Sequence, residues 1–190
     1  MDQTRLEQML QAVSTGEVSP DEALAKLRSL PFEDLGFAHV DHHRALRTGY
    51  PETIFCQGKT AAQVVAIAER LAAAESVVLA TRVDGDTARS LQDRFTLADY
   101  DEVARTVVIW PSEQRPEGGG LVLVVSAGTS DLPVAQEAVV TSTTMGARTE
   151  GIVDVGVAGI HRLLAYRERL LEARVIVVVA GMEGALASVV

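Results

Sequence analysis

The chain of 190 residues has little cysteine, few aromatic residues and a deficit of basic charge. Its single cysteine, Cys56, excludes an internal disulfide framework and fits a reducing compartment. No uncharged apolar stretch approaches the roughly 18 residues of a membrane span, and the start of the chain lacks a basic segment followed by an apolar one. We therefore expect a soluble, cytoplasmic protein with no membrane partner.

The charge balance narrows the classes of partner further. Seventeen Lys and Arg stand against 26 Asp and Glu, which gives a formal net charge of -9. This balance argues against a nucleic-acid partner, although it leaves room for a local basic pocket that takes a small phosphate compound. A hydrophobic content of 47% is ample for the core of one large or two small domains.

The stretch from Leu121 to Ala138 organises the second half of the chain. The apolar run from Leu121 to Val125 predicts a strand buried on both faces, and Asp131 is placed to cap the helix that follows. Small residues fill the loop at 126–131, where backbone N–H groups can approach an anion at the positive end of the helix dipole. The pattern favours a phosphate or ribose cradle and an ordinary strand-to-helix turn equally, because it is neither a Walker loop nor GxGxxG.

Strands and helices alternate strictly after this point. We expect a strand at 148–157, a helix at 160–171 and a strand at 175–180. This alternation predicts an α/β domain with a parallel sheet, whose ligands bind at the carboxyl ends of the strands. The strands end in small-residue loops at 126–131, 154–162 and 180–186. Their convergence favours a real site over three ordinary turns.

The first half is predicted to be a helical hairpin followed by a small α/β domain. The expected helices and strands are helices at 3–14, 21–30, 60–73 and 86–95 and strands at 76–80 and 105–110. Residues 111–120, PSEQRPEGGG, are rich in proline, glycine and charge. We place a domain boundary there, between an N-terminal domain at 1–112 and a parallel α/β domain at 118–190.

Residues 32–60 are dense in ionisable groups. One interpretation is that ion pairs there shape an anion pocket, because arginine suits carboxylate and phosphate recognition. The residues proposed for this pocket are Asp41, Arg44, Arg47 and Lys59, with Glu52 brought beside them by the turn at 49–52.

Two alternatives for the same segment stay open. Alternation in a strand would place His39, Asp41 and His43 on one face, which is the basis of a metal hypothesis. The plainer alternative is an exposed polar strand edge. We expect no metal ligand in the candidate site formed by the three strand-end loops.

Four motifs carry a resemblance to a known family. AGTSDLPVAQEA, followed by DVGVAGIHR and then AGMEGAL, resembles the carboxylase domain of the LarB family and, more distantly, aminoimidazole ribonucleotide carboxylase/mutase. The segment DHHRALRTGYPETIFCQGKT resembles the N-terminal LarB pattern, which the purine enzyme lacks. The resemblance covers roughly residues 35–190. It implies a Rossmann-like, three-layer parallel-sheet domain, similar to aminoimidazole ribonucleotide carboxylase, after the smaller N-terminal α/β domain.

The resemblance also implies an activity. The family carboxylates the pyridinium ring of nicotinic acid adenine dinucleotide with CO2 and hydrolyses its phosphoanhydride. The products are AMP and pyridinium-3,5-biscarboxylic acid mononucleotide, a precursor of the nickel-pincer nucleotide cofactor of lactate racemase. The implied partners are the dinucleotide and CO2 or bicarbonate, in a homo-oligomer. No tightly bound cofactor is expected, and magnesium is left open as an assisting ion.

Residue roles follow from the matching positions. The resemblance assigns the mononucleotide phosphate and ribose to Gly128, Thr129, Ser130 and Asp131. His161 and Arg162 would position the carboxylate or CO2, and Glu183 would transfer the ring proton. Further contacts with the dinucleotide fall to Arg44, Arg47, Glu52 and Lys59. The ordinary alternatives are a helix-start loop for His161 and first-turn electrostatics for Glu183.

One departure from the family concerns the nucleophile. The family's nucleophilic cysteine lies beyond AGMEGAL, whereas this chain ends at Val190, so we expect a C-terminally incomplete domain. Cys56 lies outside the matching motif and is expected to be a small, partly buried residue. A non-enzymatic nucleotide-binding module is therefore the second hypothesis. A metal-dependent hydrolase that uses His39, Asp41, His43 and Glu52 is a distant third.

Overall fold

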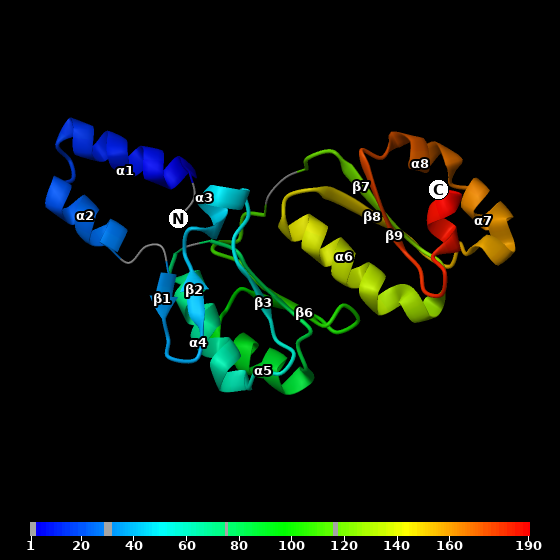
Figure 1. The fold of residues 1–190 in the computed structure, drawn as a ribbon, viewed down its shortest axis with the longest axis horizontal. Coiled ribbons are helices and arrows are strands. Elements are labelled where there is room, and N and C mark those ends of the chain that lie inside the picture. The colour runs from blue at the N-terminus through cyan, green and yellow to red at the C-terminus, as the bar shows by residue number, and fades with distance from the viewer. Residues whose placement is uncertain (1–2, 29–31, 75, 116–117) are drawn as a thin grey trace.

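The computed structural model describes residues 3–28, 32–74, 76–115 and 118–190. A helical hairpin lies at one end of the molecule, a first sheet with its helices in the middle, and a second sheet at the other end (Figure 1). Helix α6 (Leu132–Thr144) packs against the second sheet and also contacts the first. This helix positions the candidate site relative to both sheets.

The hairpin consists of α1 (Gln3–Thr15) and α2 (Pro20–Arg28), as the periodicity predicts. A reciprocal capping box starts α2, because the Ser19 hydroxyl accepts from the Glu22 backbone N–H at 3.2 Å and the Glu22 carboxylate accepts from the Ser19 N–H at 2.9 Å. The expected last residues of this helix, 29 and 30, lie outside the described residues.

The first half holds two sheets. A two-stranded antiparallel hairpin consists of β1 (Phe32–Asp34) and β2 (His39–Asp41). The larger sheet has the order β3-β4-β6-β5, made of β3 (Thr53–Phe55), β4 (Val78–Thr81), β6 (Thr106–Ile109) and β5 (Ala98–Asp101). Only β3 and β4 are parallel in it, and the other two pairings are antiparallel. The sequence predicted β4 and β6, considered a strand at β2 only in the metal and polar-edge alternatives, and missed β1, β3 and β5.

Three helices accompany these strands: α3 (Arg44–Thr48), α4 (Ala61–Ala72) and α5 (Gly85–Arg94). Thr60 starts α4 with a capping box shared with Gln63. One face of α4 is buried, formed by Val64, Ile67, Ala68 and Leu71, and Val64 is completely so. It packs with Ile54, Ala80 and Val107 from the strands, so one face of the larger sheet is the core of this half.

The second half is a three-layer unit, as predicted. Its sheet has the order β8-β7-β9, with both pairings parallel, and consists of β7 (Leu121–Ser126), β8 (Arg148–Ile152) and β9 (Val175–Val179). Helix α6 covers one face. The other face is covered by α7 (Ile160–Leu164), α8 (Arg167–Glu172) and the 3-10 helix η3 (Ala185–Ser188). The chain is thus an α/β protein whose second half is a parallel three-layer unit.

Two predicted elements are shorter than expected. The strand expected at 148–157 stops at Ile152, because Asp154 adopts a left-handed conformation with φ +58° that no strand can include. The helix expected at 160–171 is broken after Ala165, where the Tyr166 N–H bonds to the Leu163 carbonyl in a tight turn. The early end of β8 lengthens the loop that follows this strand, and the second break separates α7 from α8.

Polar contacts join α6 to the first sheet. The Arg82 guanidinium lies 3.1 Å from the Glu137 carboxylate, and the Gln136 side chain donates to Asp101 at 2.8 Å. Both sheet residues lie at the end of the sheet where β4 finishes. This end of the first sheet therefore faces the N-terminal half of α6. The division of the chain at 112–118 stays a prediction, and residues 116–117 within it lie outside the described residues.

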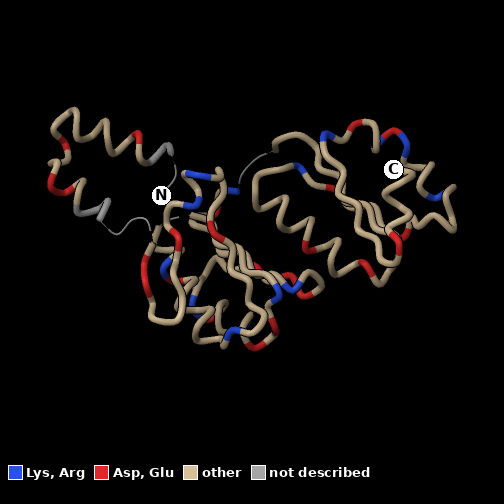
Figure 2. The backbone as a smooth tube through the Cα atoms, viewed as in Figure 1, with Lys and Arg blue, Asp and Glu red and all other residues tan. Residues whose placement is uncertain are grey.

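Acidic and basic positions are interspersed over both halves (Figure 2). Within the described part of the chain, no helix is long and apolar enough to cross a membrane.

Candidate functional site

Three strand-end loops of the second sheet meet beside the N-terminus of α6. The loop after β8 is bonded to the loop after β7, since Val155 N–H donates to the Ser126 carbonyl at 3.1 Å and Gly156 N–H donates to the Ala127 carbonyl at 2.9 Å. Ala127 N–H in turn donates to the Val179 carbonyl of β9 at 3.0 Å. Backbone hydrogen bonds therefore join the loops after β7 and β8 to each other and tie the first of them to the last residue of β9.

Gly156 makes the closest of these approaches possible. A Cβ atom added at this position would lie 2.9 Å from the Ala127 carbonyl oxygen, closer than real Cβ atoms approach an oxygen. The glycine is needed here for space, because its φ of -58° suits any residue.

The predicted cradle is a 3-10 turn, η1 (Thr129–Asp131), that leads into α6. Asp131 does not cap α6, contrary to the sequence interpretation. Its backbone is already helical, so its carboxylate instead accepts from the Gly128 N–H at 2.9 Å and closes the turn before the helix. The first N–H groups of this turn have no acceptor within the helix and remain available to an anion.

The two hydroxyl residues of the cradle are open to solvent. Thr129 and Ser130 are both exposed, and neither hydroxyl bonds to another residue of the described chain. They are therefore free to donate to a ligand at the N-terminus of α6.

Ser126 is a residue that sequence reasoning treated only as part of the loop. It is the last residue of β7 and is 0% exposed, and its hydroxyl has no hydrogen-bond partner among the described residues. A buried hydroxyl without a partner is uncommon in proteins. No sequence signal distinguishes it from the neighbouring small residues.

Glu183 and His161 differ from Arg162 in whether their side chains are paired. The Asp131 carboxylate lies 3.9 Å from the position of a Cβ at Gly181, so the loop that carries Glu183 adjoins the cradle. The side chains of Glu183 and His161 are exposed and make no hydrogen bond or ion pair among the described residues, whereas Arg162 is paired with Asp154 at 2.5 Å. The Glu183 carboxylate therefore has no partner among the described residues, and the Arg162 guanidinium is held by Asp154.

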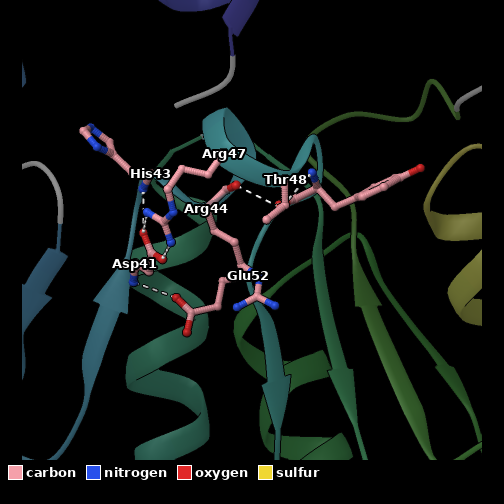
Figure 3. A network of polar contacts seen from close by, with 7 residues as sticks. Asp41, His43, Arg44, Arg47, Thr48 and Glu52 are labelled. Atoms are coloured by element: carbon pink, nitrogen blue, oxygen red, sulfur yellow. Dashed lines mark hydrogen bonds and ion pairs between the residues drawn. The ribbon is translucent and has the colours of Figure 1, made fainter.

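The second group of predicted residues is built around Asp41 (Figure 3). Arg47 pairs with the Asp41 carboxylate at 2.5 Å, and Glu52 accepts from the Asp41 N–H at 2.6 Å. The hydrogen bond from Arg47 lowers the pKa of Asp41, with help from the His43 N–H and against the desolvation of the carboxyl. Arg44 is exposed and pairs with no carboxylate of the described residues.

Lys59 does not join this group. It follows β3, whereas Glu52 precedes β3, so the two residues lie at opposite ends of this strand. The Lys59 ammonium donates to the Phe55 carbonyl at 2.6 Å. Because β3 and β4 are parallel, Lys59 and Arg82 both lie at the end of the sheet where these strands finish. This end faces the N-terminal half of α6, through the pairing of Arg82 with Glu137.

The metal hypothesis lacks the geometry that it requires. Strand β2 ends at Asp41, so His43 does not share a strand face with His39; it precedes α3, and its ring points away from the Asp41 cluster (Figure 3). Throughout the described ranges, no group of three or more His, Cys, Asp or Glu side chains is arranged to hold a metal ion.

Cys56 is buried in the core of the first half at 6% exposure, and burial raises the pKa of its thiol to about 11. We expect a thiol reagent at about pH 8 to label the folded chain about a hundredfold more slowly than the urea-unfolded chain, because the thiolate fraction is lower. Stability should also fall as the pH rises from about 9 to about 11, since the unfolded thiol loses its proton first. Equal labelling rates before and after unfolding would show that the thiol is accessible.

The fold and the loop cluster define an α/β protein whose candidate site lies where the strands of a parallel sheet end. The family described as "LarB/PurE-like N-terminal domain" matches residues 32–112. An uncharacterized protein of Methanocaldococcus jannaschii is 35% identical over 193 residues, which cover 97% of this chain and 75% of that protein. The chain belongs to the LarB family, which is of the carboxylase type.

Proposed function

We propose that the chain binds nicotinic acid adenine dinucleotide at the cradle and serves in its carboxylation and hydrolysis to AMP and pyridinium-3,5-biscarboxylic acid mononucleotide. The observation that carries this proposal is the exposed Thr129–Ser130 turn at the N-terminus of α6, in a chain of the LarB family. The two free hydroxyls and the unpaired N–H groups suit a phosphate monoester or diester.

The position of Lys59 supports a phosphorylated ligand. It follows β3 at the end of the first sheet that faces the N-terminal half of α6, where the charge of Arg82 is already balanced by Glu137. The positive charge of Lys59 favours an anion on this side of the molecule. The opposite end of this sheet, where β3 starts, carries Arg44, Arg47 and Glu52. The proposal therefore gives these residues no contact with this phosphate.

The overall reaction converts the dinucleotide, CO2 and water into the two mononucleotides. Carboxylation forms a ring carbon–carboxylate bond and releases the ring proton, and water breaks the phosphoanhydride to leave a phosphate on each half. Glu183 is the proposed acceptor of the ring proton, because its carboxylate is exposed and unpaired. His161 and Arg162 would hold the incoming carboxylate, with Arg162 exchanging Asp154 for it.

The resemblance requires a thiolate that adds to the pyridinium ring, and Cys56 does not suit this role. It is buried in the first half, and its raised pKa keeps it protonated at neutral pH. This observation favours a second candidate function, a nucleotide-binding module that holds the dinucleotide without turning it over. Association into a homo-oligomer stays part of both proposals.

The test combines calorimetry with mass spectrometry on the 190-residue chain. We expect saturable binding of nicotinic acid adenine dinucleotide, weakened about tenfold or more by the double change Thr129→Ala and Ser130→Ala, because two hydrogen bonds to phosphate are lost. The matched control is Ser142→Ala with Thr143→Ala, the same residue types at the other end of α6, which should bind as the unmodified chain does.

The products then separate the two functions. Incubation with the dinucleotide and 13C-bicarbonate should give AMP together with a labelled dicarboxylated mononucleotide if the chain catalyses the reaction. Binding without either product establishes the nucleotide-binding module. No binding, or equal weakening by both double changes, would overturn the proposed site.

A further inference from the structure

A pocket lies at the opposite end of α6 from the cradle. Its volume is about 380 Å3, and its walls come from the β3 and β4 edge of the first sheet, the α3 region and the C-terminal end of α6. This volume falls within the roughly 300–1,000 Å3 typical of small-molecule sites. Because α6 has 13 residues, about 20 Å separates this pocket from the cradle.

The pocket has a largely apolar and partly aromatic lining. Leu71 contributes from the core of the first half, Leu79 is a buried residue of β4 outside that core cluster, and Met145 lines the pocket from the end of α6. Tyr50 and Trp110 supply two aromatic side chains. Such walls fit a flat ring better than a flexible polar chain.

Trp110 is fixed in place from outside the pocket. Its indole N–H donates to the Asp99 carboxylate at 2.8 Å, and the Arg115 guanidinium lies over its ring at 4.4 Å from the centroid. The ring is therefore a pre-positioned wall, which lowers the entropy cost of binding a flat ligand.

The charged groups of the pocket are carboxylates. Asp41 and Glu52 line it together with His42, and no lysine or arginine of the described residues does so. Glu52 is anchored through one carboxylate oxygen to the Asp41 N–H. Its other oxygen bonds to no described residue, so it is free to accept from a ligand.

Arg47 neutralises Asp41 from outside the lining, and Arg44 also lies outside it. The cations predicted for an anion pocket here are thus excluded from the cavity. A carboxylate that faces an apolar cavity favours a cation or a strong hydrogen-bond donor and disfavours another anion.

We propose that this pocket is a binding site for a planar aromatic cation, whose ring packs between the apolar walls and whose positive group pairs with Glu52. The site goes beyond the proposed function and uses none of the cradle residues. The two proposals are tested with different ligands and different variants, so the failure of one is distinguishable from the failure of the other.

The chain offers a direct probe, because Trp110 is its only tryptophan. Trp110 fluorescence can be titrated with benzamidinium, benzamide and benzoate, three ligands of nearly the same shape that carry positive, zero and negative charge. We expect saturable quenching by benzamidinium at a concentration about tenfold or more below that needed for benzoate, with benzamide between them. Equal binding of benzoate and benzamidinium, or no saturation by benzamidinium, would overturn the proposal.

A substitution tests the role of the carboxylate. Glu52→Gln keeps the size of the side chain and should remove most of the preference for benzamidinium over benzamide. The matched control is Glu113→Gln, an equal change of charge at an exposed residue that does not line the pocket, and it should keep that preference. An unchanged preference in Glu52→Gln would refute the pairing, and if that variant does not fold, the ligand series on the unmodified chain decides.

Discussion

Replacing Leu163 by alanine lowers the free energy of unfolding by about 2–5 kcal/mol, the cost of removing a large apolar side chain from a core. Leu163 is 1% exposed and packs with Leu123, Val125 and Leu186 between the parallel sheet and its covering helices. It also holds α7, which carries His161 and Arg162, so the substitution should loosen the candidate site. Urea unfolding followed by circular dichroism measures the effect.

The neighbouring residue is the control. Leu164 is 60% exposed, and Leu164→Ala should change the free energy of unfolding by no more than about 0.5 kcal/mol. Similar losses in the two variants would mean that α7 does not pack on the sheet in the orientation described.

Gly156→Ala is expected to lower the free energy of unfolding by about 1–3 kcal/mol, the usual cost of forcing an extra methyl group into a packed position. The new Cβ would lie 2.9 Å from the Ala127 carbonyl oxygen, which is backbone and cannot rotate away. The loop after β7 must shift, so binding at the cradle should weaken as well. Thermal unfolding and ligand calorimetry on the same variant report both effects.

Gly128→Ala provides the comparison within the same site. Its backbone is extended, with φ -140°, and a Cβ there would meet its nearest neighbours, Asp131 and Ser130, at ordinary contact distances of 3.8 and 3.9 Å. The variant should keep its stability to within about 0.5 kcal/mol. A larger loss in Gly128→Ala than in Gly156→Ala would contradict the described approach of the two loops.

The parallel half could be predicted because each of its elements has a strong local signal. The run from Leu121 to Val125 is apolar throughout, as expected of a central strand buried on both faces. The run at Val175–Val179 is also apolar throughout, although β9 is an edge strand and is only partly buried. The ends of the elements were less predictable, because the break at Tyr166 and the left-handed Asp154 depend on contacts beyond the local pattern.

The first half was harder to predict for a physical reason. Strands β1, β2 and β3 have three residues each, too few to show an alternation, and β5 is polar because it lies at the edge of its sheet. Missing β5 also hid the hairpin from β5 to β6, which makes β6 antiparallel to β4. An apparent strand-helix-strand order therefore concealed a mixed sheet.

The candidate site shows the same limit. The cradle at 128–131 could be found, because its small residues lie between a strand and a helix that both have clear patterns. The grouping of Lys59 with Arg44, Arg47 and Glu52 rested on nearness in sequence. Strand β3 lies between Glu52 and Lys59 and places them at its opposite ends, which only the fold reveals.

The most direct test of the proposed nucleotide site is to map backbone amide chemical shifts of the 15N-labelled chain while nicotinic acid adenine dinucleotide is added. The account predicts that the largest saturable shifts occur at Gly128, Thr129, Ser130 and Asp131, with smaller ones in the loops that carry His161 and Glu183. Saturable shifts confined to other parts of the chain, or no shifts at all, would contradict it.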